Sequence, residues 1–172
     1  ASSAAKTPSF RAELSQEFIE KMAELARLHD IGKVNVPDYI LHKTEPLAER
    51  EFDLVKKHVT DGARTIDMIR LAFPEYAFLD FAHDLILYHH ERWDGTGYPE
   101  GRSARNIPLV ARITADAFDA MTTSRVYRAA ATFDEAYATI DGGSGSAFDP
   151  ELVEIFRFCR SRFTEIAEKN RD

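Results

Sequence analysis

The chain has 172 residues, enough for one domain that buries a core without disulfide bonds. Hydrophobic residues make up 44% and charged residues 30%, a balance typical of a globular protein and not of a disordered chain. No apolar run is long enough to span a bilayer, and the formal net charge of −7 disfavours non-specific binding to nucleic acid or to an acidic membrane.

The predicted elements, taken in chain order, are all helices. Apolar residues recur at helical spacing, and no stretch shows the alternation of a half-buried strand. The first helix is expected to begin near Ser15 and to stop near Gly32. Further helices are predicted over 47–58, 63–71, 76–90, 109–123, 134–140 and 150–167, with breaks at Pro46, at Asp61-Gly62 and at Pro74. A loop rich in Gly and Pro covers 93–108, a length more typical of a functional loop than of a simple connection.

The ends and the cysteine content indicate the compartment. Residues 1–7 are small and polar without an apolar signal core, and the single cysteine, Cys159, excludes both an intramolecular disulfide framework and a thiolate metal cluster. We therefore expect a cytoplasmic protein. Residues 1–13 are interpreted as an N-terminal edge, truncated from a longer chain.

Polar residues occupy several of the predicted apolar helix faces. At helical spacing, His29 follows Leu25, His58 follows Leu54, His89 follows Leu85, and Asp116 lies in line with Leu109 and Ile113. A single such residue is better explained as a core histidine or a capping aspartate with satisfied hydrogen bonds. Taken together they favour a shared divalent metal, because one ion satisfies many buried polar atoms at once.

Two adjacent pairs, His29-Asp30 and His89-His90, strengthen the metal interpretation. Neighbouring helical residues point about 100° apart, so a pair can hold one ion from two directions or contribute to two ions. Imidazole nitrogens mixed with carboxylate oxygens suit Fe, Mn, Zn or Ni better than Ca or Mg. The sequence does not choose among these four metals.

These residues belong to a longer pattern. The sequence LHDIGK from Leu28 to Lys33, then His58, then HHERWDGTGYP from His89 to Pro99 resembles the HD-GYP family of bacterial cyclic di-GMP phosphodiesterases. Further matches follow in order at Ile107-Pro108, 115–120, 124–128, Gly145 and 148–150. The resemblance covers roughly residues 14–157, and we assign the HD-GYP domain to residues 14–172.

The resemblance implies a single all-α HD-type helical bundle, with a metal centre in its core and the GYP loop at its mouth. The implied metal ligands are His29, Asp30, His58, His89, His90 and Asp116. Asp30, as the bridging ligand, and Lys33 would be catalytic. Lys33, Tyr98, Arg125 and Arg128 would contact the substrate. The implied cofactors are divalent ions, usually Fe or Mn, with Zn or Ni as alternatives.

Two features differ from the family pattern. No histidine precedes His29, whereas family members usually carry an upstream Glu and His that help to hold a third metal, so we expect two ions. The segment from Ala111 to Asp116 is two residues shorter than in family sequences, which would rotate Asp116 by about 200° on a helix. Whether Asp116 is a ligand, and whether the protein is active, stays open at this stage.

The leading hypothesis is a metal-dependent phosphodiesterase that hydrolyses cyclic di-GMP to pGpG, GMP or both, with a metal-bridging hydroxide as nucleophile. One alternative is a sensor or docking module that binds a cyclic dinucleotide or a diguanylate cyclase domain without turnover. Another is a phosphohydrolase acting on pGpG, mixed cyclic dinucleotides or mononucleotides. The implied ligand is cyclic di-GMP or a related guanine dinucleotide, and the chain is expected to be one part of a longer multidomain signalling protein.

Overall fold

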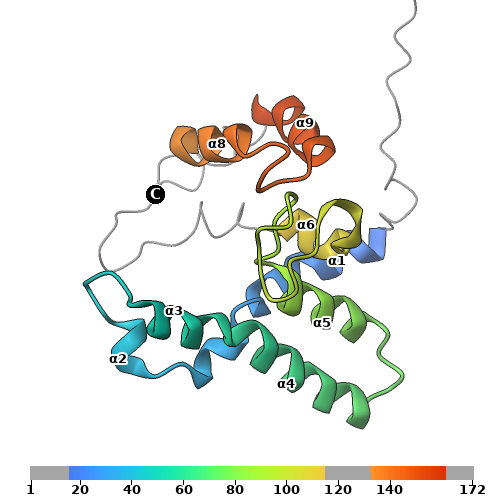
Figure 1. Ribbon diagram of the computed structural model, residues 1–172. Coiled ribbons are helices and arrows are strands. Elements are labelled where there is room, and N and C mark those ends of the chain that lie inside the picture. The colour runs from blue at the N-terminus through green and yellow to red at the C-terminus, as the bar shows by residue number, and fades with distance from the viewer. Residues whose placement is uncertain (1–15, 115–132, 162–172) are drawn as a thin grey trace, which may run out of the picture.

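The computed structural model describes residues 16–114 and 133–161 (Figure 1). The first range contains helices α1 (Gln16–Leu25), η2 (Ala26–Leu28), η3 (Ile31–Asn35), α2 (Asp38–Leu41), α3 (Glu49–Lys56), α4 (His58–Ala72), α5 (Phe78–Tyr88), η4 (Ala104–Asn106) and α6 (Leu109–Thr114), and the second contains α8 (Phe133–Gly142) and α9 (Pro150–Phe158). The described residues form no strand, only an isolated bridge between Ser144 and Phe148. The predicted all-α class is confirmed. Within the described ranges no helix has the length and apolar character needed to cross a membrane.

Helices α4 and α5 lie side by side and form the main core with α1 and α6 (Figure 1). The buried residues of this core are Leu25, Ile66, Leu79, Ala82, Leu85, Ile86 and Val110. On α5 they recur three and four positions apart, so one stripe of the helix faces inward over its whole length. His89 follows Leu85 by one helical turn, and its amide still donates to the Leu85 carbonyl. The core stripe of α5 therefore leads directly to the first of the two adjacent histidines.

The predicted break at Asp61-Gly62 is wrong, because α4 continues through both residues. Gly62 is buried against η3, where a Cβ would lie 2.7 Å from the Ile86 side chain and 3.2 Å from the Gly32 amide nitrogen. The glycine thus allows two backbones to approach and does not end a helix. The short helix α2 was not predicted.

Other helix boundaries differ from those predicted. The first helix ends at Leu25 and continues as the 3₁₀ helix η2, short of the predicted end near Gly32. The helix predicted over 150–167 is found as α9 up to Phe158, with a turn at Cys159 and helical residues again at 160–161. Residues 162–167 lie outside the described residues. The helix predicted over 109–123 is found up to Thr114. Its remainder and the predicted start at Ser15 lie outside the described residues.

Replacing Gly32 with alanine is expected to destabilise the protein. A Cβ at Gly32 would overlap the backbone carbonyl of His58 and lie 2.6 Å from the Gly62 nitrogen, and neither backbone group can move as a flexible side chain would. We expect a loss of about 3 kcal/mol in the free energy of unfolding, measured by urea denaturation. Gly142→Ala is the control, because nothing lies within 4 Å of its Cβ position. Equal stability of the two variants would contradict the close approach of η3 to α4.

The helix pair α8 and α9 is fastened to the rest of the chain by a buried ion pair and by backbone hydrogen bonds. Arg112 on α6 donates through Nη1 to Oδ2 of Asp149 at 2.6 Å, and the two side chains are 9% and 2% exposed. The amides of Trp93 and Asp94 donate to carbonyl oxygens of residues 146–147 at 3.2 and 2.9 Å. The start of the 93–108 loop is therefore braced by the turn that precedes α9.

Candidate metal centre

Four side chains of types that can bind a metal meet where η3, α4 and α5 converge. Asp30 precedes η3, His58 is the first residue of α4, and His89 and His90 follow the last residue of α5. Each offers one ligand atom, and these atoms all lie within 4.8 Å of one another. His58 and His89 are almost fully buried. Residues that are up to 60 positions apart in the sequence thus form one compact cluster of three imidazoles and a carboxylate.

The imidazole rings are oriented by the backbone. In His29, His58 and His89, Nδ1 lies 2.7, 2.7 and 2.9 Å from the carbonyl oxygen three residues earlier in the chain. A carbonyl only accepts, so Nδ1 carries the proton in His58 and His89, and the Nε2 atoms of these two rings have a lone pair. The Nε2 atoms of His58 and His89 face each other at 3.3 Å. Such backbone bonds to the second ring nitrogen are typical of metal-binding histidines.

The histidines of the cluster are held in the neutral form that binds metals. Burial, together with the neighbouring His90 and His58, lowers the pKa of His89 to about 2. Burial also lowers the pKa of His90 to about 3. Burial lowers the pKa of His58 as well, against the opposing hydrogen bond to the Val55 carbonyl. Near neutral pH, no proton has to leave these imidazoles before an ion binds.

Asp30 carries the clearest sign that the cluster fits a cation. Its Oδ1 is buried without a hydrogen-bond partner and lies 3.4 Å from His58 Nε2 and 3.9 Å from His89 Nε2. Burial raises the pKa of the Asp30 carboxyl, but hydrogen bonds from His29 and Lys33 outweigh this and hold it below its usual range. An ionised, unpaired oxygen facing imidazole lone pairs is unfavourable without a positive charge between them. The donor set of nitrogen and oxygen suits a divalent transition metal.

The structure brings together only some of the predicted ligands. His29 lies beside the four-residue cluster, with Nε2 3.2 Å from Asp30 Oδ2 and its ring edge-on to His89 at 5.1 Å between centroids. Its role as a ligand stays a prediction. Asp116, Arg125 and Arg128 lie outside the described residues.

Lys33 and Tyr98 both lie at the cluster. Lys33 Nζ donates to Asp30 Oδ2 at 2.6 Å. The Tyr98 ring stacks on His90 with 4.7 Å between centroids and 23° between planes. The backbone fixes this stack, because the Tyr98 amide donates to the His90 carbonyl at 3.2 Å and a Cβ at Gly97 would collide with the backbone of residues 90–92. Gly97 is thus required for the close approach of the loop to the histidine pair.

Glu91 is a site residue that the sequence reasoning missed. Its side chain is 2% exposed, and Oε1 accepts a hydrogen bond from the Glu100 amide at 2.8 Å, while Oε2 is buried with no partner. The Glu91 carboxylate therefore links the residues that follow α5 to position 100 of the loop. A charged residue at the end of an apolar helix is normally solvated, so the residue type gives no indication that Glu91 is buried. The one sequence feature that could have identified it is its position next to the His89-His90 pair.

Removing the Glu91 carboxylate is expected to loosen this loop. Glu91→Ala leaves the Glu100 amide without its acceptor, and we expect a loss of about 1 kcal/mol in unfolding free energy together with faster hydrogen exchange at the Tyr98 and Glu100 amides. Glu91→Gln keeps an acceptor oxygen and is expected to stay close to the parent protein. Unchanged exchange in Glu91→Ala would show that the loop is held by other contacts.

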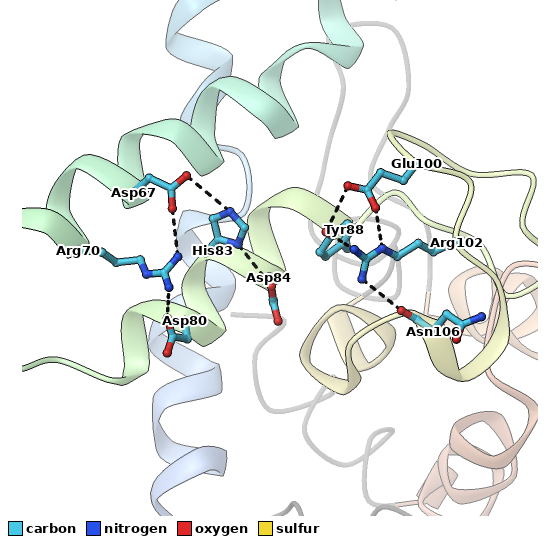
Figure 2. Close-up of polar contacts among 9 residues, drawn as sticks. All are labelled: Asp67, Arg70, Asp80, His83, Asp84, Tyr88, Glu100, Arg102 and Asn106. Carbon is cyan, nitrogen blue, oxygen red and sulfur yellow. Dashed lines mark hydrogen bonds and ion pairs between the residues drawn. The ribbon is translucent and has the colours of Figure 1, made fainter. Parts of the chain in front are cut away.

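A second set of contacts anchors the far end of the loop to α5 (Figure 2). Arg102 donates to Glu100 at 2.8 Å and to the Tyr88 hydroxyl at 2.6 Å, and its guanidinium lies 3.9 Å from the centre of the Tyr88 ring. A separate polar group on α4 and α5, also in Figure 2, places His83 between Asp67 and Asp84. His83 therefore pairs with these two carboxylates and is not part of the cluster of Asp30, His58, His89 and His90.

Comparisons with known proteins agree with this arrangement. A family model described as "HD domain" matches residues 1–152. The chain is 39% identical over 167 residues to a protein of Vibrio cholerae named cyclic di-GMP phosphodiesterase, a match covering 96% of this chain and 34% of the relative. It is 37% identical over 161 residues to a Thermotoga maritima protein of the same name, with 92% and 42% covered.

A third relative, from Vibrio cholerae, is named 3'3'-cGAMP-specific phosphodiesterase 3 and is 41% identical over 134 residues, with 77% of this chain and 28% of the relative covered. The chain thus spans well under half the length of the relatives it matches. The family match extends over most of the chain and includes the whole histidine and aspartate cluster. The chain belongs to the HD domain family.

Proposed function

We propose that this chain is the catalytic domain of a metal-dependent phosphodiesterase that hydrolyses cyclic di-GMP to pGpG, GMP or both. The observation that carries the proposal is the partly buried cluster of Asp30, His58, His89 and His90, whose ligand atoms all lie within 4.8 Å of one another and which includes an unpaired carboxylate oxygen. The relatives named cyclic di-GMP phosphodiesterases support the choice of substrate.

The proposed cofactors are two divalent transition-metal ions, Fe or Mn, with Zn or Ni as alternatives. Asp30, His58, His89 and His90 would hold them, with Asp30 bridging, and the proposed set also includes His29 and Asp116. When bound, such ions supply a nucleophile at neutral pH and neutralise charge on the attacking and leaving oxygens of a phosphodiester.

The remaining residues act on the substrate. Lys33 places an ammonium group at the edge of the cluster, fixed by its bond to Asp30, where it stabilises negative charge on a non-bridging phosphate oxygen. Tyr98, stacked on His90, restricts how the substrate enters. Arg125 and Arg128 are proposed, from the family pattern, to contact the substrate.

The domain is proposed to occupy residues 14–172 of a longer multidomain signalling protein. The relatives support this, since the matched region covers 34% and 42% of the two cyclic di-GMP phosphodiesterases. A diguanylate cyclase domain is a candidate partner.

The test is product analysis by chromatography after incubating anaerobically reconstituted, Mn- or Fe-loaded protein with cyclic di-GMP. We expect release of pGpG or GMP by the parent protein. We expect Lys33→Met to retain its metal and to lower the rate on the order of 10²–10³-fold. Metal-loaded protein that leaves cyclic di-GMP intact would contradict the proposal.

A second candidate substrate is 3'3'-cGAMP, since a relative named for that substrate is 41% identical to this chain. The two cyclic dinucleotides differ in one base. Their kcat/KM values, measured side by side on the same protein preparation, decide between them. A higher value for 3'3'-cGAMP would replace cyclic di-GMP as the proposed substrate.

A further inference from the structure

Three aromatic rings form a continuous path from the metal-binding cluster to the surface. His90 contacts Tyr98 at 4.7 Å between centroids, and Tyr98 in turn contacts Phe52 on α3, edge to face, at 6.4 Å and 81°. Phe52 ends the path with 46% of its surface exposed. The exposed ring therefore lies only two ring contacts away from a residue proposed to bind metal.

Phe52 is held in this place by the start of α3. Glu51 Oε2 accepts hydrogen bonds from the Ala48 amide at 2.7 Å and from Lys43 Nζ at 2.5 Å, which fixes the first turn of the helix. No residue of α3 is buried, so the helix does not use Phe52 to join the core. A half-exposed aromatic ring in a fixed place beside a polar site offers a face on which a nucleobase can stack.

The charge beside Phe52 fits the same kind of ligand. Lys56 Nζ lies 5.1 Å from the centre of the Phe52 ring and pairs with Asp53 Oδ1 at 2.6 Å. Asp53 is 56% exposed, and an exposed pair of this kind contributes little, so the ammonium remains able to donate to a ligand. Guanine presents two acceptors, O6 and N7, on one edge and a flat face for stacking.

We propose that Phe52 and Tyr98, with Lys56 beside them, form a subsite that stacks one purine base of the substrate next to the metal centre. This inference rests on the proposed function, since it assumes a cyclic dinucleotide as ligand. The subsite would let α3, which carries no metal ligand, contribute to substrate affinity.

The test compares Phe52→Ala with the parent protein on cyclic di-GMP and on methyl p-nitrophenyl phosphate, a phosphodiester without a nucleobase. In Phe52→Ala we expect KM for cyclic di-GMP to rise about 5- to 150-fold. This factor should be at least five times the factor by which KM for the small substrate rises. Phe52→Trp is expected to restore the parent KM. Equal KM values for parent and Phe52→Ala on cyclic di-GMP, or equal losses on both substrates, would overturn the subsite.

Phe73→Ala is the matched control, since Phe73 is 50% exposed, contacts a tyrosine ring at 6.1 Å and lies at the opposite end of α4 from His58. It should change neither KM. If the parent hydrolyses neither substrate, the proposed function fails, and calorimetry on metal-loaded protein then decides the subsite separately. A Kd for cyclic di-GMP that weakens in Phe52→Ala but not in Phe73→Ala supports it, and absence of binding by the parent overturns it.

Discussion

Replacing His89 with alanine is expected to lower cyclic di-GMP hydrolysis on the order of a thousandfold and to reduce the metal content of the purified protein. His89 is 3% exposed, and its Nε2 lies 3.3 Å from His58 Nε2 and 3.9 Å from Asp30 Oδ1. The side chain thus contributes a lone pair at the centre of the cluster. Rates and metal-to-protein ratios are measured on the same preparations.

His42→Ala is the control for this experiment. His42 is an exposed histidine whose Nδ1 contacts the Asp38 carbonyl in α2, outside the cluster. Its removal is expected to change neither the metal content nor the rate. If His89→Ala keeps its full metal content and activity, the cluster is not the metal centre.

The largest effect on stability is expected from Arg112→Met, which breaks the buried ion pair with Asp149. The change leaves the Asp149 carboxylate, 2% exposed, without its cation, and we expect a loss of about 3–5 kcal/mol in unfolding free energy. Asp149 also accepts the Glu151 amide at the start of α9, so the Arg112 pair and the helix cap share one side chain. Urea denaturation followed by circular dichroism measures the loss.

Arg105→Met provides the matched control, because Arg105 is 66% exposed and pairs with Glu151 at 3.4 Å on the surface. An exposed pair contributes about 0–1 kcal/mol. In the double variant Arg112→Met/Asp149→Asn the unpaired charge is removed while an acceptor for the helix cap remains, so part of the lost stability should return. A loss in Arg112→Met no larger than in Arg105→Met would show that the pair does not fasten α9.

Much of the metal-binding cluster could be predicted from helical periodicity. His58 and His89 were identified because they continue apolar faces, and both are buried in the structure. Asp30, which follows His29 in the sequence, and His90, which follows His89, complete the cluster. For His89, periodicity works because the buried stripe of α5 also directs this side chain inward. His58 is buried for a different reason, because Leu54 lies on the preceding helix α3, which has no buried residue, and His58 begins α4.

Contacts between distant backbones could not be predicted in this way. Gly62 reads as a helix break by local propensity, but its close approach to Gly32 keeps it inside α4, which is a tertiary effect. The buried role of Glu91 depends on the path of a loop that returns to place the Glu100 amide against it. The stack of Tyr98 on His90 depends on the same loop path.

The most direct test of the central claim is the metal content per chain, measured by elemental analysis on protein purified and reconstituted without oxygen. We predict about two equivalents of Fe or Mn, because the cluster presents neutral imidazoles and an unpaired carboxylate oxygen at neutral pH. A content near zero after reconstitution would contradict the assignment of Asp30, His58, His89 and His90 as a metal centre, and with it the proposed hydrolysis.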